Sequence, residues 1–190
     1  MDTTHRIRAH FADSAQLKLA AVDVMAPHIA RAASLITDCL LADGKILACG
    51  NGGSAADAQH FAAEMVGRFE RERPELPAIS LVTDTSILTA IANDIGTEAI
   101  FLRQVIAYGR EGDAAIAIST SGNSVNLIEA LTEARRRELV TLAFVGYDGG
   151  RIASEGLTDH VIVTPSQHIP RIQEAQASAY HALRELIELR

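Results

Sequence analysis

A glycine-rich turn leads directly into an alanine-rich helix in the stretch Cys49-Gly50-Asn51-Gly52-Gly53-Ser54-Ala55-Ala56-Asp57-Ala58-Gln59-His60-Phe61-Ala62-Ala63-Glu64. The apolar run Lys45–Cys49 leads into this turn and is typical of a short buried strand. Glycines adopt backbone conformations that other residues resist, so the turn can approach a ligand closely. The stretch therefore predicts a strand, a ligand-binding turn and a helix in succession.

The first turn of this helix is a candidate anion site. The alanine-rich run that begins at Ala55 favours a helix, whose first backbone N–H groups have no partner within the helix. Those groups and the positive end of the helix dipole face the turn, where they would stabilise a phosphate group. Ser54 is expected either to cap the helix or to contact the ligand.

His60 and Glu64 lie one turn apart on the same face of the predicted helix, close enough to share a metal ion or a substrate. Taken alone, such a pair is more often a modest helix-stabilising contact between exposed side chains. Its position two turns beyond a phosphate-type turn favours a functional site in this chain.

A second strand and polar turn resemble the first in their chemistry. The apolar run 114–118 leads into Ser119-Thr120-Ser121-Gly122-Asn123-Ser124 and then into a helix. Ligands of parallel sheets bind beyond the carboxyl ends of the strands, so both turns are expected to hold one small molecule between them. The alternative is a polar turn with a helix cap. Four hydroxyls and an amide in six residues exceed what a cap needs, which favours a site.

Strands and helices alternate along the rest of the sequence. The predicted strands are 46–49, 78–82, 114–119, 140–145 and 159–163, and the predicted helices are 55–66, 86–92, 125–136, 150–155 and 170–190. This alternation predicts an α/β fold with a central parallel sheet flanked by helices. Ahead of the sheet we expect one helix over roughly 4–22 and a second that ends near Ala42.

One domain, 1–190, is expected, because 190 residues with 48% hydrophobic content suffice for one well-buried core. Within it, residues 1–44 are expected to form an N-terminal helical oligomerisation segment, and 45–190 the α/β core. Cys39 and Cys49 lack the spacing of a metal site or a redox pair and are expected in the core.

Composition disfavours a membrane protein and a nucleic-acid-binding protein. We expect no segment of the length and hydropathy needed to span a membrane, and the N-terminus lacks the apolar core of a signal peptide. A cytoplasmic location follows as an expectation. A formal net charge of −7 argues against direct nucleic-acid binding, which depends on clustered Lys and Arg.

Four separated motifs carry a family resemblance. They are the stretch 49–64, Ile-Ala-Asn-Asp at 91–94, Ile-Ser-Thr-Ser-Gly-Asn-Ser at 118–124, and Arg-Ile-Gln-Glu at 171–174. With these motifs in order, the sequence resembles the phosphoheptose isomerases, which have a three-layer sugar-isomerase (SIS) fold. The resemblance covers nearly all of the chain from Lys45 onward.

The resemblance implies an isomerase that converts sedoheptulose 7-phosphate to D-glycero-D-manno-heptose 7-phosphate for heptose nucleotide biosynthesis. It also implies a homotetramer with sites at the subunit interfaces and one Zn²⁺ per site. The implied zinc ligands are His60, Glu64, Gln173 and His181. The implied substrate-binding residues are Asn51, Gly52, Gly53, Ser54, Glu64, Asn93, Asp94, Ser119, Thr120, Ser121, Ser124 and Gln173.

An aldose–ketose isomerisation makes sense of these residue types. The reaction removes a proton beside a carbonyl, passes through an enediol or enediolate, and returns the proton to the neighbouring carbon. Glu64 and His181 are the candidate acid and base. A metal held by His and Glu side chains would polarise the oxygens of the substrate as a Lewis acid.

The spacing of Gln173 and His181 needs explanation, because eight residues of straight helix span roughly 12 Å. Either the helix begins after Gln173 or bends, or the two side chains serve different parts of the site. The second possibility predicts a composite site at an interface between subunits. One departure from the family is Gln176, where members commonly have histidine, which puts a supporting role for this position in doubt.

The main alternative function is that of a DnaA initiator-associating SIS protein, a non-enzymatic relative with a similar Arg68–Pro74 neighbourhood. Such a protein would bind a replication initiator and keep only a vestigial sugar site. His181 and Ser121 are isomerase-like here, and they favour the enzyme. A sugar-phosphate-sensing SIS module of a regulator is less favoured, because the chain is acidic and has no appended DNA-binding region.

Overall fold

A computed structural model describes residues 2–68 and 70–189 of the chain. Its elements are α1 (Thr3–Leu41), β1 (Ile46–Gly50), α2 (Gly53–Val66), β2 (Ala78–Ser80), α3 (Thr85–Asp94), η1 (Thr97–Ala99), α4 (Leu102–Tyr108), β3 (Ala114–Ile118), α5 (Val125–Arg136), β4 (Val140–Gly146), α6 (Gly150–Ser154), β5 (His160–Thr164) and α7 (Ile169–Glu188). Positions 69 and 190, which belong to the Arg68–Pro74 neighbourhood and to the predicted last helix, lie outside the described residues.

The five strands form one sheet in the order β2-β1-β3-β4-β5, and every neighbouring pair is parallel. All residues of β1 and β3 are buried, as a parallel sheet with both faces covered requires. Gly50 pairs with Ile118, so the two strands end level with each other. The predicted α/β fold with a central parallel sheet flanked by helices is confirmed.

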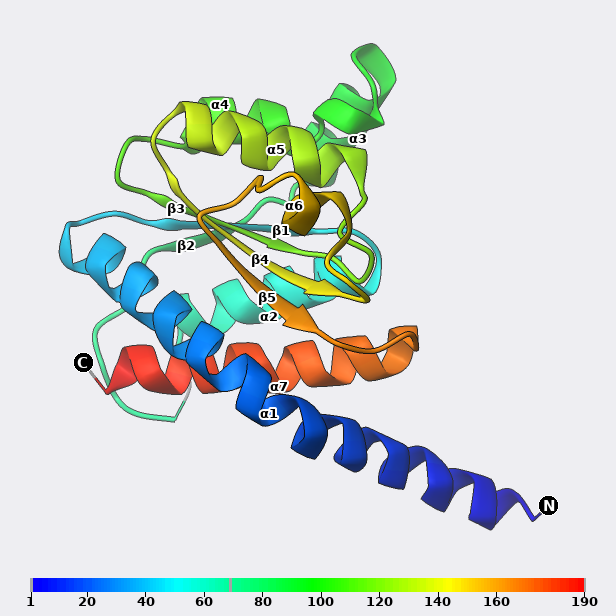
Figure 1. The fold of residues 1–190 in the computed structure, drawn as a ribbon. Coiled ribbons are helices and arrows are strands. Elements are labelled where there is room, and N and C mark those ends of the chain that lie inside the picture. Colours follow the sequence, from blue (N-terminus) through cyan, green and yellow to red (C-terminus); the bar gives the residue numbers. More distant parts are fainter. Residues whose placement is uncertain (1, 69, 190) are drawn as a thin grey trace.

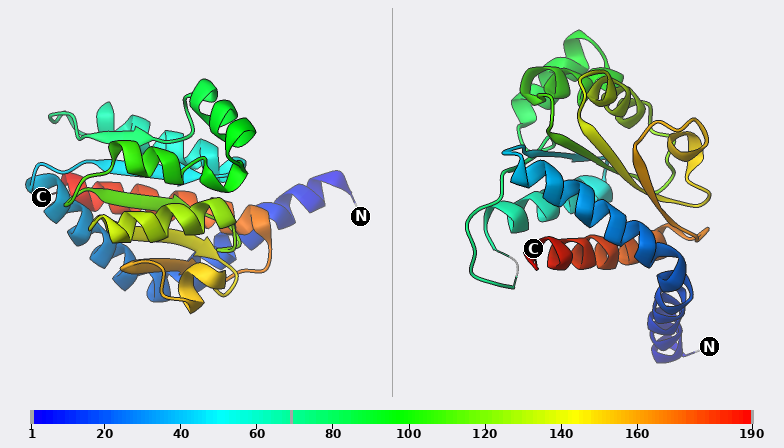
Figure 2. Two further views of the ribbon diagram at one scale, coloured as in Figure 1. Left: turned by 90° about the horizontal axis from the view of Figure 1, so that it is seen from above. Right: turned by 60° about the vertical axis from the view of Figure 1, so that its left-hand side comes forward.

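Helices cover both faces of the sheet in a three-layer arrangement (Figures 1 and 2), with α1, α2 and α7 on one face and α4, α5 and α6 on the other. The alternation of side chains along β1 divides the core accordingly. Ile46 and Ala48 belong to the apolar cluster beneath α1, α2 and α7, whereas Leu47 and Cys49 belong to the cluster beneath α4 and α5.

Helix α2 buries one face and presents another to α7. Ala58, Phe61 and Met65 are buried at helical spacing against the sheet. The ring of Phe61 packs edge-on against Tyr180 of α7, with their centroids 6.4 Å apart. His60 and Glu64 follow the same helical period on the side of α2 that faces α7, so the packing of this helix determines where these two side chains point.

The prediction of two N-terminal helices is wrong. One continuous helix, α1, runs from Thr3 to Leu41 with Pro27 inside it. A single proline removes one hydrogen-bond donor, and the helix-favouring residues on either side continue the helix across it. The buried residues of α1 begin at Ala21, and the part before them projects from the body of the molecule (Figure 1).

The expectation that no segment meets the criteria for a membrane span is also wrong. Helix α1 contains a window that is long and apolar enough to cross a membrane. In this fold the apolar residues of that helix include buried ones that pack against α7 and β5, among them Met25, Ala33 and Ile36. The core helix of a globular protein passes the same test of length and composition.

Residues 97–108 form two short helices, η1 and α4, which the sequence did not predict. Buried Phe101 and Val105 attach this segment to the core beneath α5. The other predicted elements are present, with ends that differ by a few residues. Cys39 and Cys49 are free thiols in the core, as expected.

Candidate functional site

The two polar turns meet at the carboxyl edge of the sheet. We call Asn51–Gly53, after β1, the glycine turn, and Ser119–Ser124, after β3, the serine turn. Together they enclose a small cavity of about 70 Å³. Its lining residues are Asn51, Ser54, Ile118, Ser119, Thr120, Ser121, Ser124 and Leu127. The predicted convergence of the two turns on one ligand site is therefore what the fold produces.

The serine turn is shaped by hydrogen bonds between its backbone N–H groups and its own serine hydroxyls. The N–H of Gly122 donates to the Ser119 hydroxyl (3.0 Å), and the N–H of Asn123 donates to the Ser121 hydroxyl (3.2 Å). Gly122 has φ of +65°, and a Cβ at this position would lie 2.0 Å from the carbonyl oxygen of Gly149. Ser124 is the N-cap residue of α5 but makes no side-chain capping bond. Its hydroxyl is thus available to a ligand.

The glycine turn lets α7 approach closely. Helix α2 begins at Gly53 with Gly52 as its N-cap, so Ser54 lies inside the helix and the capping alternative for it is wrong. Ser54 is buried and lines the small cavity. A Cβ on Gly53 would lie 2.5 Å from the side-chain nitrogen of Gln173, so a larger residue here would displace this amide.

Asn51 and Asn126 form a reciprocal amide pair, which ties the glycine turn to α5. Each side-chain nitrogen donates to the other residue's side-chain oxygen at 2.9 Å. Both residues also line an open cleft of about 530 Å³ next to the small cavity, together with Thr97, Glu98, Ser124 and Val125. Asn126, Thr97 and Glu98 were not singled out from the sequence, because they lie outside the turns and η1 was not predicted.

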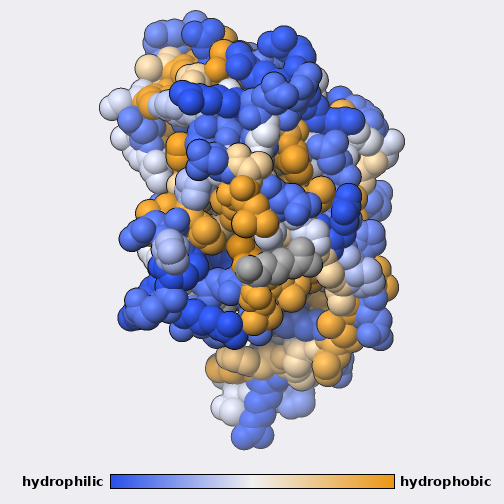
Figure 3. Space-filling model, turned by 90° about the vertical axis from the view of Figure 1, so that its left-hand side faces the viewer, coloured by the Kyte–Doolittle hydropathy of each residue, from blue (hydrophilic) through white to orange (hydrophobic). Residues whose placement is uncertain are grey.

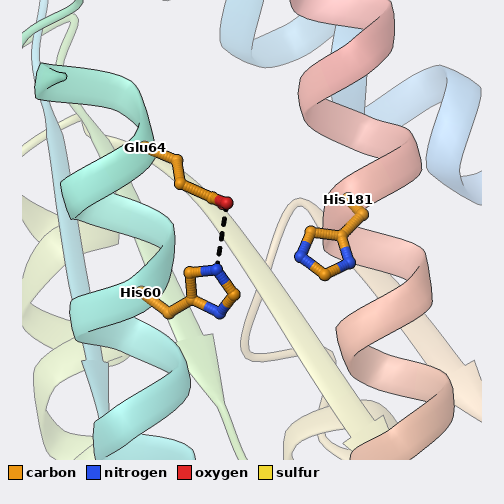
Figure 4. Close-up of side chains that lie close together, drawn as sticks. All are labelled: His60, Glu64 and His181. Carbon is orange, nitrogen blue, oxygen red and sulfur yellow. Dashed lines mark ion pairs between the residues drawn. The ribbon is translucent and has the colours of Figure 1, made fainter. Parts of the chain in front are cut away.

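His60, Glu64 and His181 converge from two helices. Each offers one ligand atom, and these atoms lie within 4.8 Å of one another. Nε2 of His60 lies 3.0 Å from Oε1 of Glu64, and the two imidazole rings are 5.3 Å apart at their centroids. Figure 4 shows His60 and Glu64 on α2 facing His181 on α7. We call these three residues the donor cluster.

A buried arginine side chain contacts the donor cluster at Glu64. Arg184 is 1% exposed and forms an ion pair with Oε2 of Glu64. Its Nε donates to the carbonyl of Tyr180, and its guanidinium lies 5.5 Å from the centroid of the Tyr180 ring. Burial lowers the pKa of Arg184 to about 10, opposed by the charge of Glu188. Arg184 therefore stays charged at neutral pH and supplies Glu64 with a permanent partner.

A second arginine fixes the end of α2. Arg73 donates from Nη2 to the backbone carbonyl of Glu64 (2.6 Å) and from Nε to the carboxylate of Glu188 on α7 (2.8 Å). These charged hydrogen bonds hold α2 and α7 at a fixed separation. The donor cluster is thus supported from the loop that follows α2.

The donor cluster fits a metal ion of the zinc type. Two imidazole nitrogens and a carboxylate oxygen are the ligands that Zn²⁺ takes in catalytic sites with an open position. Burial, and secondarily the charge of His60, lowers the pKa of His181, so its imidazole is neutral and able to coordinate at pH 7. The donor atoms and their spacing suit a single small cation.

Gln173, expected among the zinc ligands, lies near the start of α7 beside the glycine turn. Helix α7 begins at Ile169, four residues before Gln173, so the possibility that the helix begins after Gln173 is wrong. The eight-residue separation from His181 amounts to roughly 12 Å along the axis. The Gln173 amide instead lies against Gly53 of the glycine turn.

Asn93 and Asp94 lie on α3, a helix without buried residues among those described, where they hydrogen-bond to each other at 2.7 Å. Neither residue lines the two cavities described above. Helix α3 projects from the upper layer (Figure 1). The fold of one chain therefore does not bring these two residues to the turns.

Gln176 joins α7 to the serine turn. Its side chain is fully buried, and its nitrogen donates to the backbone carbonyl of Ser119 at 3.1 Å. The position that departs from the family pattern thus keeps a supporting contact, made by an amide. Gln176 lies between Gln173 and His181 on the helix, so one segment of α7 touches both turns and the donor cluster.

Comparison with known proteins agrees with this geometry. The SIS domain family matches residues 10–146. A phosphoheptose isomerase of Laribacter hongkongensis is 50% identical over 189 residues, which are 99% of this chain and 96% of that protein. A phosphoheptose isomerase of Aromatoleum aromaticum is 52% identical over 191 residues, again 99% of this chain and 96% of that protein.

Solved structures show the same relationship. Phosphoheptose isomerase GmhA from Neisseria gonorrhoeae superposes with a TM-score of 0.93 at 47% identity, and a phosphoheptose isomerase from Francisella tularensis with a TM-score of 0.94 at 38% identity. Both matches cover 100% of this chain and of the other chain. The chain belongs to the SIS-domain family and, within it, to the phosphoheptose isomerases.

Proposed function

We propose that this protein interconverts sedoheptulose 7-phosphate and D-glycero-D-manno-heptose 7-phosphate, a step of heptose nucleotide biosynthesis. The observation that carries the proposal is the donor cluster of His60, Glu64 and His181, built partly on the helix that begins at the glycine turn. A phosphate site and an acid/base site are thereby fixed to one rigid element. The names of the relatives point to the same substrate class.

The phosphate end of the substrate is assigned to the small cavity between the turns. The cavity is lined by hydroxyls and by Asn51, and the first turn of α2 adds backbone N–H groups and a positive dipole end. Its volume of about 70 Å³ suits a compact anion rather than a whole sugar.

The proton transfers are assigned to Glu64 and His181. Conversion of the ketose to the aldose removes a proton from C1 and returns one to C2, with an enediol or enediolate between the two steps. Glu64 forms an ion pair with Arg184, and its carboxylate oxygen is the proposed acceptor of the carbon-bound proton. A neutral His181 can pass a proton between substrate oxygens.

A single Zn²⁺ is proposed as the cofactor, held by His60, Glu64 and His181 and stabilising oxyanion charge on the substrate when bound. Gln173 was expected as a fourth ligand, but its amide lies against Gly53 in this chain. We assign Gln173 to substrate contact at the glycine turn. Other divalent ions accept the same imidazole and carboxylate donors.

A homotetramer with composite sites is proposed for the assembly, in the cytoplasm. Asn93 and Asp94 do not reach the turns of their own chain, so a neighbouring copy is their proposed target. The projecting part of α1 exposes Phe11 and Leu19, which are 72% and 75% exposed and would be covered by another subunit. Figure 3 shows a further face on which apolar side chains gather.

Solvent isotope exchange tests the proposal. Purified, zinc-supplied protein is incubated with sedoheptulose 7-phosphate in D₂O, and the sugars are followed by NMR. The proposal expects an aldose heptose 7-phosphate to form, with deuterium entering at C2 of the aldose and at C1 of the remaining ketose. No aldose product would refute the isomerase, and a product without deuterium would refute the enediol route.

Nothing in the relatives supports the initiator-associating alternative.

A further inference from the structure

A chain of hydrogen bonds runs from the donor cluster through Tyr180 of α7 to Asp57 of α2. Nδ1 of His60 lies 3.1 Å from the hydroxyl oxygen of Tyr180, and that hydroxyl donates to Oδ1 of Asp57 at 3.2 Å. Asp57 precedes His60 by three residues on α2, whereas Tyr180 comes from α7 next to His181. Neither Asp57 nor Tyr180 has a role in the function proposed above.

The direction of these hydrogen bonds follows from the number of protons present. A phenol has one proton, which it keeps at neutral pH because the ordinary pKa of tyrosine is about 10. The proton is donated to the carboxylate of Asp57. The Tyr180 oxygen then has only lone pairs to offer His60, so Nδ1 of His60 must carry the hydrogen in their contact.

The proton on Nδ1 leaves the other ring nitrogen of His60, Nε2, without a hydrogen. With its proton on Nδ1, a neutral His60 presents the lone pair of Nε2 to Oε1 of Glu64 at 3.0 Å. Two acceptors at this distance repel each other unless a cation lies beside them. Nε2 and Glu64 therefore form a pair that requires either a metal ion or a proton to be stable.

We propose that Asp57 and Tyr180 are positioning residues that hold the proton of His60 on Nδ1 and so reserve its Nε2 for the cation shared with Glu64 and His181. A partner on the second nitrogen of a metal-binding histidine commonly fixes its tautomer and ring orientation. Here the partner is a phenol backed by a carboxylate, and it spans the same two helices that supply the donors. The inference rests on the proposed function only for the identity of the cation.

Two variants test this inference. Tyr180→Phe keeps the buried ring and removes the acceptor for Nδ1, whereas Asp57→Asn keeps Tyr180 and removes the carboxylate that orients its proton. Tyr108→Phe, at an exposed tyrosine on α4, is the matched control. Zinc affinity is measured by chelator competition, and folding is checked by thermal unfolding. Both site variants are expected to bind zinc about 10- to 100-fold more weakly, with the control unchanged.

Imidazole ¹⁵N–¹H correlation spectra of the metal-free protein supply a readout that is independent of both zinc and turnover. At a pH above the titration of the imidazole, wild-type His60 is expected to carry its proton on Nδ1, and Tyr180→Phe is expected to shift it toward Nε2. A wild-type His60 protonated on Nε2 alone, or zinc affinity unchanged in both folded variants, would overturn the inference. A protein that isomerises no heptose phosphate would refute the proposed function without affecting this test.

Discussion

The serine turn and the donor cluster are both parts of the proposed site, yet they are built from different kinds of structure. The serine turn is held by hydrogen bonds from its backbone N–H groups to its own serine hydroxyls and by the positive φ of Gly122. The donor cluster depends on side chains from α2 and α7 and on the buried cation of Arg184. The turn should therefore be most sensitive to backbone changes, and the cluster to changes of a single functional group.

The largest effect is expected from Glu64→Gln in the donor cluster. The change keeps the size of the side chain but removes the charge and the basic oxygen, so kcat should fall by about 10²- to 10⁴-fold. The serine turn is untouched, so the affinity for sedoheptulose 7-phosphate, measured by calorimetry, should change little. Glu185→Gln, at an exposed position on α7, is the control. Equal losses of binding and turnover would contradict the proposal that the donor cluster serves catalysis and the serine turn serves substrate binding.

The second-largest effect is expected from Gly122→Ala in the serine turn. The new Cβ would strain a φ of +65° and meet the Gly149 carbonyl, which should cost more than the about 1–3 kcal/mol of backbone strain alone. The change should raise KM more than it lowers kcat. Gly112→Ala separates the two causes, because Gly112 has φ of +84° with nothing within 4 Å of a Cβ. Equal destabilisation of both variants would rule out the steric contribution.

Gln176→Leu tests the contact that joins the two regions. The substitution removes the donor to the buried Ser119 carbonyl and should destabilise the fold by about 1–3 kcal/mol. KM for the sugar phosphate should rise as the serine turn loosens. Gln176→His, which can restore a donor, should recover much of the loss. Chemical unfolding and steady-state kinetics measure both effects, and an unchanged KM in Gln176→Leu would show that the turn does not depend on α7.

The smallest effect is expected far from both regions, at Glu133 on α5. Hydrogen bonding to Arg136 first, and to Arg137, holds the pKa of Glu133 at about 2, below its ordinary value of 4.5. The stabilisation is therefore present above about pH 4.5 and lost as the pH falls toward 2. Glu133→Gln should lower the Tm slightly at neutral pH and make no difference in strong acid. Glu129→Gln, on the same helix, is the control, and an effect that grows in acid would contradict the assignment.

The strands and the two turns were predicted well from the sequence. The backbone freedom of glycine, the hydrogen-bonding hydroxyl of serine and the burial of apolar runs each determine the structure of their own short stretch of chain. The convergence of His60 with Glu64 also followed from helical spacing, and the two turns met because parallel strands share a carboxyl edge. The continuity of α1 across Pro27 did not follow, since one lost hydrogen bond is offset by packing elsewhere in the helix.

Contacts between distant segments were beyond the reach of sequence patterns. Arg184 and Tyr180 lie on an amphipathic helix where nothing distinguishes them from ordinary core residues, and only the packing of α7 on α2 gives them partners. The amide pair of Asn51 and Asn126 joins residues 75 positions apart. The place of Gln173 depended on where α7 begins, which proline at its first turn indicated only approximately.

Turnover of sedoheptulose 7-phosphate by the purified protein, with and without a chelator and beside His181→Ala, tests the central claim most directly. That claim is that the donor cluster carries out the chemistry at a site whose turns bind the phosphate. It predicts turnover by the zinc-supplied wild type, loss of turnover on chelation, and a His181→Ala variant that binds the sugar phosphate without converting it. Undiminished turnover by His181→Ala, or none by the zinc-supplied wild type, would contradict it.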